Sequence, residues 1–227
     1  MKKCYIIGAG EMYGSVHPCE DDLVIAADGG LKHLEALGIV PDVIVGDFDS
    51  LGEKDDACTR AKFCGSFLQD KKIISISGKE VEIIRHPVEK DETDMYLAYE
   101  IGMARGYTEF ELFGGVGGRE DHTFANYCLL LRAKNDKSNV ILVGNGAKTF
   151  VLKNEKKRIF GKAGATVSVF AFGNFCEGVS IRGLKYEAQN ISLAPDRPLG
   201  VSNSFTYSGE GEISVENGAL LVTVFNR

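Results

Sequence analysis

Two aspartates, Asp47 and Asp49, follow a short apolar stretch in the segment PDVIVGDFDS (residues 41–50) and are separated by a single phenylalanine. In extended backbone alternate side chains point to the same face, so we expect the two carboxylates to lie side by side. Neighbouring negative charges raise the pKa of a carboxyl group, which is unfavourable unless a cation binds between them. The segment alone is equally consistent with an aspartate-rich turn that ends a strand.

A second acidic cluster, KDETD (residues 90–94), precedes a stretch with apolar residues at helical spacing. Taken alone, it favours a helix start in which Asp91 is the cap and Asp94 lies three residues further on, both stabilised by the helix dipole. Beside Asp47 and Asp49, the same carboxylates could instead converge on a hard cation. Mg²⁺ takes a few carboxylates together with the phosphate oxygens of a substrate.

The glycine-rich segment GGVGGREDH (residues 114–122) precedes another helical pattern, a place where backbone N–H groups receive anions. It is neither a Walker A loop nor a dinucleotide fingerprint. Arg119 can bind a phosphate through two hydrogen bonds, and the alternative is a surface ion pair with Glu120 or Asp121. His122 could be a core or capping histidine. These groups together suit phosphoryl or pyrophosphoryl transfer from a nucleotide, in which positioning and charge neutralisation supply nearly all the rate.

The elements that would position these residues alternate along the first two thirds of the chain. Strands are predicted at residues 3–7, 22–27, 42–45, 108–113 and 139–143, and helices at 31–38, 91–106 and 121–134. This alternation predicts a mostly parallel sheet, in which ligands bind beyond the carboxyl ends of the strands. The glycines and aspartates of residues 8–10, 28–30 and 46–50 fall at those ends. Residues 72–87 are typical of a hairpin turning around residues 77–79, at an edge of the sheet.

After Gly144 the pattern changes to β-branched and aromatic segments separated by Gly, Asn and Pro, without a helix of useful length. The expected fold class is therefore α/β, with two domains. Residues 1–145 would form a mostly parallel sheet with flanking helices, and residues 146–227 a C-terminal all-β sandwich.

Composition limits the possible partners. The net charge is -6 with an isoelectric point near 5.3, and no basic block offers a surface for nucleic acid. No run approaches the ~18 apolar residues of a membrane span, and the N-terminal apolar run is too short for a secretory signal. The 6 cysteines lack the spacing of zinc sites or of a disulfide framework. We expect a cytoplasmic protein that binds neither nucleic acid nor membranes.

Several motifs together resemble the thiamine pyrophosphokinase family. They are ADGG (residues 27–30), PDVIVGDFDS, KDETDMYLA, GGVGGREDH followed by Ala125 and Asn126, and GLKY and SNSF in the β-rich part. They occur in the family's order and cover most of the chain, whereas residues 53–87 match less well. The resemblance implies the fold class given above and a homodimer whose active sites lie between the α/β domain of one subunit and the sandwich of the other. It also implies the reaction of ATP with thiamine to give AMP and thiamine diphosphate.

The resemblance also implies roles for individual residues. Asp47, Asp49 and Asp94 with Arg119 would be the catalytic group, and Mg²⁺ would be held by Asp47, Asp49, Asp91 and Asp94. The residues expected to bind ATP or thiamine are Asp28, Gly29, Gly30, Lys90, Thr93, Asp121, His122, Ser180, Tyr186, Ser202, Asn203 and Ser204. Among these, Asp121 would reach the aminopyrimidine of thiamine, and Tyr186 would pack on the vitamin at a position where the family often has tryptophan or tyrosine. Because thiamine is cationic, an aromatic face suits it, although Tyr186 taken without the resemblance favours an ordinary strand tyrosine.

Two other functions remain open from the residues. The chain could be a different Mg²⁺-dependent phosphotransferase or nucleotide hydrolase that uses the same sheet edge with another acceptor. It could also be a thiamine or nucleotide sensor without catalytic activity, which would not need convergent carboxylates.

Overall fold

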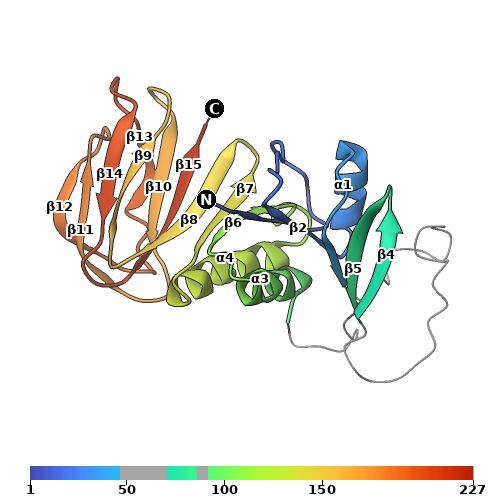
Figure 1. Ribbon diagram of the computed structural model, residues 1–227. Helices are drawn as coiled ribbons and strands as arrows, with labels where there is room; N and C mark the ends of the chain where they lie inside the picture. Colours follow the sequence, from blue (N-terminus) through green and yellow to red (C-terminus); the bar gives the residue numbers. More distant parts are fainter. Residues whose placement is uncertain (47–70, 86–91, 227) are drawn as a thin grey trace. The chain divides into compact units, whose positions relative to one another are not determined.

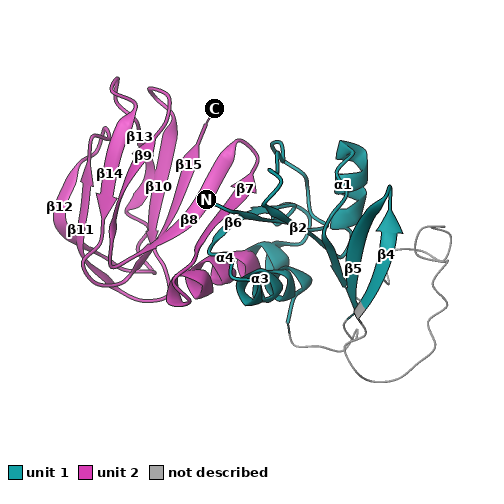
Figure 2. Ribbon diagram, viewed as in Figure 1, with its two compact units in different colours: residues 1–123 teal, residues 124–227 magenta. Residues whose placement is uncertain are grey.

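The structure is a computed structural model that describes residues 1–46, 71–85 and 92–226 (Figure 1). It is strand-rich, with mixed sheets and few helices. The chain forms two compact units, Met1–Thr123 and Phe124–Arg227 (Figure 2). The division falls inside a helix rather than at the change of pattern after Gly144, and each unit is described below by itself.

The first unit is built on a sheet with the strand order β6-β1-β2-β3-β5-β4. Its strands are β1 (Cys4–Ile7), β2 (Leu23–Ala27), β3 (Val43–Gly46), β4 (Lys71–Ile76), β5 (Lys79–Arg85) and β6 (Glu109–Phe113). All neighbours pair in parallel except β4 and β5. Every residue of β1, β2 and β3 is buried, as expected for parallel strands covered on both faces. The parallel pairing inferred from the alternation of strands and helices is therefore confirmed.

β4 and β5 form the hairpin predicted at the sheet edge (Figure 1). The turn residues Ser77 and Gly78 both have positive φ, 51° and 83°, as the two central residues of a type I′ turn require. This turn follows the right-handed twist of the strands, so a glycine in second place favours a tight hairpin here.

In the described part of this unit, α1 (Gly30–Leu37) packs against β1 and β2, and α3 (Asp94–Ala104) packs against β1, β2 and β3. α3 buries Met95, Ala98, Tyr99 and Gly102, the i, i+3, i+4, i+7 spacing of one helix face. The Tyr99 ring is fully buried, with its centroid 5.0 Å from that of Phe110 on β6. This packing fixes the N-terminal end of α3 against the sheet.

The second unit begins within α4 (Glu120–Asn135) and continues as strands. They are β7 (Asn139–Gly144), β8 (Ala147–Lys153), β9 (Lys156–Phe160), β10 (Thr166–Ala171), β11 (Cys176–Arg182), β12 (Ala188–Leu193), β13 (Gly200–Ser204), β14 (Glu210–Ser214) and β15 (Ala219–Phe225). All described pairs are antiparallel, in the orders β13-β10-β15-β8-β7 and β12-β11-β14-β9.

One apolar core joins the two sheets of the second unit. It includes Val167 and Val222 from the first sheet and Val179 and Ile213 from the second, all fully buried. Alternating buried and exposed residues in β11 and β14 show that the second sheet turns one face to this core. Within residues 146–226 the structure contains no helix, as the sequence predicts.

Candidate active site

Two glycine-containing loops meet at the carboxyl edge of the parallel sheet. The amide of Gly8, directly after β1, donates to the Phe113 carbonyl at the end of β6 (2.8 Å), and the amide of Gly10 donates to the Gly114 carbonyl (2.8 Å). Gly114 has φ of 61°, and a Cβ there would lie 2.2 Å from the Gly8 carbonyl oxygen. Only glycine fits this approach, so the segment that leads to Arg119 is anchored to the end of β1.

Asp28 lies at the same edge, directly after β2, and its amide donates to the Val45 carbonyl of β3 (2.8 Å). Its φ of 49° is in the left-handed region, which aspartate tolerates better than most residues. Gly46, the residue before Asp47 in the chain, packs against Asp28: a Cβ on Gly46 would lie 3.2 Å from the Asp28 Cα. Asp28 is therefore adjacent to the point where the PDVIVGDFDS segment leaves β3.

The turn after Asp28 leads straight into α1. Gly29 is the N-cap, without a side-chain hydrogen bond, and a Cβ on Gly30 would lie 1.9 Å from the Ile7 carbonyl oxygen of β1. The helix start thus presses against the end of β1, and its backbone N–H groups point toward the carboxyl edge, where an anion would be stabilised.

α3 begins at Asp94, and its N-cap is Thr93, whose Oγ1 accepts a hydrogen bond from the Tyr96 amide (3.2 Å). The alternative that Asp91 caps this helix is therefore wrong. Met95 packs against Gly8 at the end of β1. The contact is so close that a Cβ on Gly8 would lie only 2.7 Å from the Met95 Sδ. The first turn of α3, with Asp94, is thereby fixed at the same sheet edge as Asp28.

Four of the predicted site residues, Asp47, Asp49, Lys90 and Asp91, lie outside the described residues. Among the residues that the structure does describe, no group of three or more His, Cys, Asp or Glu side chains could hold a metal ion. The metal set with Asp94 therefore stays a prediction.

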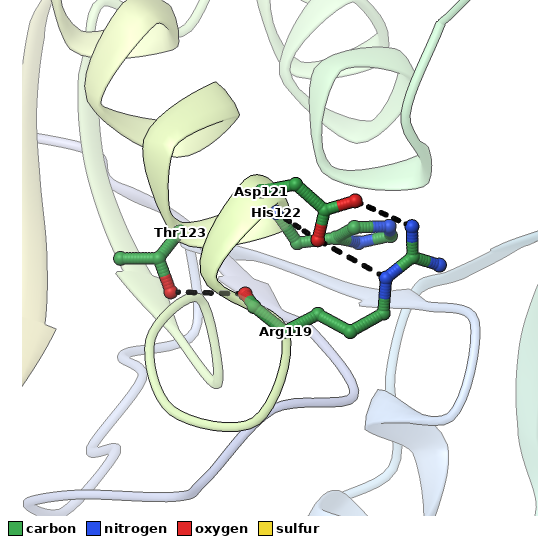
Figure 3. Close-up of polar contacts among 4 residues, drawn as sticks. All are labelled: Arg119, Asp121, His122 and Thr123. Carbon is green, nitrogen blue, oxygen red and sulfur yellow. Dashed lines mark hydrogen bonds and ion pairs between the residues drawn. The ribbon is translucent and has the colours of Figure 1, made fainter.

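Arg119 and Asp121 form a two-bond ion pair at the start of α4 (Figure 3). Arg119 Nε and Nη2 donate to the two carboxylate oxygens of Asp121 at 3.1 and 2.6 Å, and the His122 amide donates to Oδ1 at 3.0 Å. The hydrogen bonds from Arg119 lower the pKa of Asp121 to about 2, and Asp121 raises the pKa of Arg119. The surface ion pair that the sequence left open for Arg119 is thus present in this structure.

Tyr186 and Asn203 line a groove of about 210 Å³ in the second unit. The other lining residues are Ile181, Glu187, Ala188, Ile191, Leu193, Leu199, Gly200 and Val201. Tyr186 is 61% exposed, so it is not an ordinary buried strand tyrosine. Most of the lining residues are apolar, and the carboxylate of Glu187 accepts a hydrogen bond from the Gly183 amide (2.7 Å).

The three predicted serines of this unit do not belong to the lining of this groove. The Ser180 hydroxyl accepts from the Asn190 amide (3.0 Å), and the Ser202 amide donates to the Ser168 hydroxyl (3.2 Å). The Ser204 carbonyl accepts from the Lys185 amide (2.9 Å). Each therefore has a structural contact in the sheets, and a role in binding stays a prediction.

Sequence reasoning missed two side chains near these residues. His33 Nε2 lies 2.8 Å from the Gly10 carbonyl oxygen, and Lys185 Nζ lies 5.2 Å from the centroid of the Tyr186 ring. The position of Lys185 directly before Tyr186 is a weak sequence signal for the second contact. No sequence pattern links His33 to Gly10.

Comparison with known proteins gives a consistent result over both parts of the chain. Residues 19–142 match the family model "Thiamin pyrophosphokinase, catalytic domain", and residues 151–220 match "Thiamin pyrophosphokinase, vitamin B1 binding domain". A curated relative, the thiamine pyrophosphokinase of Bacillus subtilis (strain 168), is 26% identical over 211 residues, 89% of this chain and 87% of its own.

Solved structures share the fold. The crystal structure of thiamine pyrophosphokinase from Bacillus subtilis has a TM-score of 0.82 at 21% identity, covering 100% of this chain and 99% of its own. The enzyme from Geobacillus thermodenitrificans has a TM-score of 0.80 at 24% identity, covering 99% and 98%. Because the catalytic-domain model alone spans more than half of the residues, the chain belongs to the thiamine pyrophosphokinase family, enzymes that transfer pyrophosphate to thiamine.

Proposed function

We propose that the chain carries out this transfer by direct in-line attack. The thiamine hydroxyl oxygen would form a bond to the β-phosphorus of ATP while the bond from that phosphorus to the bridging α–β oxygen breaks, so that AMP leaves. The observation that carries the proposal is the gathering of Asp28, the first turn of α3 and the loop before Arg119 at one carboxyl edge. Ligands of open parallel sheets bind at this place.

We propose Mg²⁺ as the cofactor, held by Asp47, Asp49, Asp91 and Asp94. Carboxylate oxygens are the donors this ion prefers, and Asp94 opens a helix that is fixed at the sheet edge. When bound, the ion supplies neutralisation of charge on the triphosphate, without which an acidic cluster repels ATP. One aspartate would accept the hydroxyl proton of thiamine.

Arg119 would stabilise negative charge on the transferring phosphate, because a guanidinium binds phosphate through two hydrogen bonds. Its present partner is Asp121, so phosphate must share or replace that carboxylate. The release of Asp121 would then free its carboxylate to accept from the amino group of the thiamine pyrimidine. His122, exposed beside this pair, would also contact substrate.

We propose that ATP binds to the first part of the chain, residues 1–145, as the catalytic domain, through Asp28, Gly29, Gly30, Lys90 and Thr93. Residues 146–227 would form the sandwich domain for thiamine binding and dimerisation, with Tyr186, Asn203 and the three serines. The limits of the two family matches, 142 and 151, support a change of role between them. A homodimer would bring the two kinds of site together.

We also propose a cytoplasmic location. Cys4, Cys19, Cys128 and Cys176 are free thiols in the described part of the chain, as in a reducing compartment. No helix among the described residues is long and apolar enough to cross a membrane.

Incubation with ATP, Mg²⁺ and thiamine, followed by mass spectrometry, tests the reaction. AMP together with thiamine diphosphate supports it. ADP, or hydrolysis of ATP without thiamine, would instead support another phosphotransferase or a hydrolase, and saturable thiamine binding without product would support a sensor.

Replacing the predicted metal ligand Asp49 tests the chemistry more closely. Asp49→Asn keeps the size of the side chain and removes its charge, so we expect turnover to fall by about 100-fold or more with an unchanged circular dichroism spectrum. Release of AMP at a rate near that of the unchanged protein would contradict the metal role.

A further inference from the structure

Asn203 is buried, only 5% exposed, yet it carries a polar side chain that lines the groove. Among the described residues, the hydrogen bonds of its side chain go to backbone groups. Its Oδ1 accepts from the Tyr186 amide (2.9 Å) and from the Ser204 amide (2.8 Å), and its Nδ2 donates to the Tyr186 carbonyl (2.7 Å). The carboxamide therefore satisfies both the N–H and the C=O of Tyr186, as a neighbouring peptide group in a sheet would.

The segment around Tyr186 is tied to β13 at three successive points. Leu184 and Phe205 form an isolated antiparallel bridge, and the Lys185 amide donates to the Ser204 carbonyl (2.9 Å). The third point is the pair of bonds between Asn203 and Tyr186. The side chain of Asn203 thus continues a backbone ladder for one more residue, up to the position that carries the ring.

The Tyr186 ring itself is held much less firmly. It is 61% exposed, and the contact to the ring that the structure gives is Lys185 Nζ at 5.2 Å from its centroid. A flexible lysine on an exposed ring fixes little, so the direction of the ring depends on the backbone at residue 186. That backbone is what Asn203 binds.

We propose that Asn203 is a positioning residue that holds the backbone of Tyr186, and so keeps its ring at the groove. This goes beyond direct vitamin contact, because Oδ1 and one N–H of the Asn203 carboxamide already bind backbone groups. It rests on the proposed function only for the identity of the ligand, thiamine. Asn203 acts through Tyr186 rather than on the substrate.

The test uses the absence of tryptophan from the sequence. Tyr186→Trp places a single indole at the position of the ring and serves as the parent protein. Its fluorescence anisotropy without ligand reports how firmly the ring is held, and a thiamine titration of its fluorescence reports binding without catalysis. KM for ATP is measured alongside.

In this parent, we expect Asn203→Ala to lower the anisotropy of the ligand-free indole. The dissociation constant for thiamine should rise about tenfold, the size expected for one lost net hydrogen bond, while KM for ATP stays unchanged. Asn203→Ser can replace one of the two bonds to residue 186 and should lie between parent and alanine variant. It also carries the test if the alanine variant does not fold.

Asn154→Ala is the matched control. Asn154 also uses its side-chain oxygen to accept from a backbone amide, that of Gly218 (2.9 Å), and lies in the same unit in the turn between β8 and β9. It should lower stability without changing the anisotropy or the thiamine titration. A general loosening of the unit would instead change the indole signals in both variants.

Unchanged anisotropy in folded Asn203→Ala or Asn203→Ser would overturn the positioning role. Another outcome distinguishes the positioning role of Asn203 from the proposed binding of thiamine in this groove. If the anisotropy falls as expected but thiamine alters the fluorescence of no variant, including the parent, then Asn203 does hold residue 186, and the assignment of this groove to thiamine fails.

Discussion

Arg119 and Asp121 hold each other through two hydrogen bonds on an exposed surface, so a substrate that binds either must share it with its partner or replace that partner. Such a pair adds little to stability, because water and salt screen it. Its main effect is on the two side chains themselves. The pair holds the guanidinium in a defined place at the start of α4 and keeps the carboxylate ionised.

Removing the arginine charge should be visible in the titration of its partner. In Arg119→Gln, we expect the pKa of Asp121 to rise from about 2 toward the ordinary value of 3.8, because the hydrogen bonds from Arg119 are the largest cause of the shift. Carbon-detected NMR of the carboxyl group measures it.

The lowered pKa of Asp121 also determines how its contribution to folding stability changes with pH. A carboxyl group with a lowered pKa in the folded state favours folding above its unfolded pKa, and this contribution disappears as the pH falls through about 2. Asp121 therefore cannot cause any change in activity between pH 5 and 9. An Asp121 pKa that stays near 2 in Arg119→Gln would show that the His122 amide, not Arg119, sets it.

Lys185 offers a second prediction at this scale. Its ammonium lies over the Tyr186 ring, where it would compete with and repel a cationic ligand bound at that ring. Lys185→Gln removes the charge, and since an exposed cation–π contact is worth ~0.5–1 kcal/mol, thiamine should bind two- to fivefold more tightly. Isothermal titration measures this. Weaker binding in the glutamine variant would mean that the lysine supports the ring rather than occupying it.

At the scale of elements, three consecutive residues at the start of α3 both begin the helix and position a predicted site residue. Thr93 caps the helix, Asp94 is its first residue, and Met95 packs against Gly8. Apolar spacing in the sequence predicted the presence of the helix correctly. It extended the start to residue 91, because four acidic or hydroxyl residues in a row, 91–94, do not show which of them is the cap.

The cap can be tested by itself. Thr93→Ala removes the acceptor for the Tyr96 amide and should lower the free energy of unfolding by about 1 kcal/mol. Because the first turn carries Asp94, the KM for magnesium-bound ATP should rise as well. Thr93→Ser keeps the hydroxyl and should restore both values. Loss of ATP affinity in the serine variant too would place the methyl group, not the cap, in the site.

Other features of the elements were not accessible to sequence reasoning. The glycine pattern indicated loops at the strand ends, but the close approach of Gly114 to Gly8 depends on two strands that are more than a hundred residues apart. The groove beside Tyr186 combines side chains of β11, β12 and β13. Neither periodicity nor composition encodes which edges of two sheets come to share a surface.

At the scale of the whole molecule, the chain consists of two compact units with different sheet types. The family motifs predicted different roles for two parts of the sequence. The residues expected to bind ATP fall before residue 146, and those expected to bind thiamine, apart from Asp121, fall after it. The division between the two units falls within α4 and differs from the predicted functional limit after residue 145, because a helix can pack with either neighbour without changing the sequence pattern.

Hydrogen exchange should show which segments of the chain bind magnesium-bound ATP and which bind thiamine. Magnesium-bound ATP should slow amide exchange in residues 8–11, 28–31 and 114–121, where loops meet at the sheet edge, whereas thiamine should slow it in residues 183–187 and 200–204. Bound ligand restricts the local opening that exchange requires. Mass spectrometry of peptides follows both. Protection by thiamine confined to the sheet-edge loops would contradict the assignment of the groove.

The left-handed backbone conformation of Asp28 limits which residue types can occupy this position. Most side chains strain at a φ of 49°, while asparagine and glycine accept it. The substitutions at residue 28 that keep this backbone conformation are therefore ones that remove the negative charge. A descendant with asparagine there would keep the backbone conformation and lose the negative charge, so this replacement separates the contribution of the carboxylate from that of the backbone.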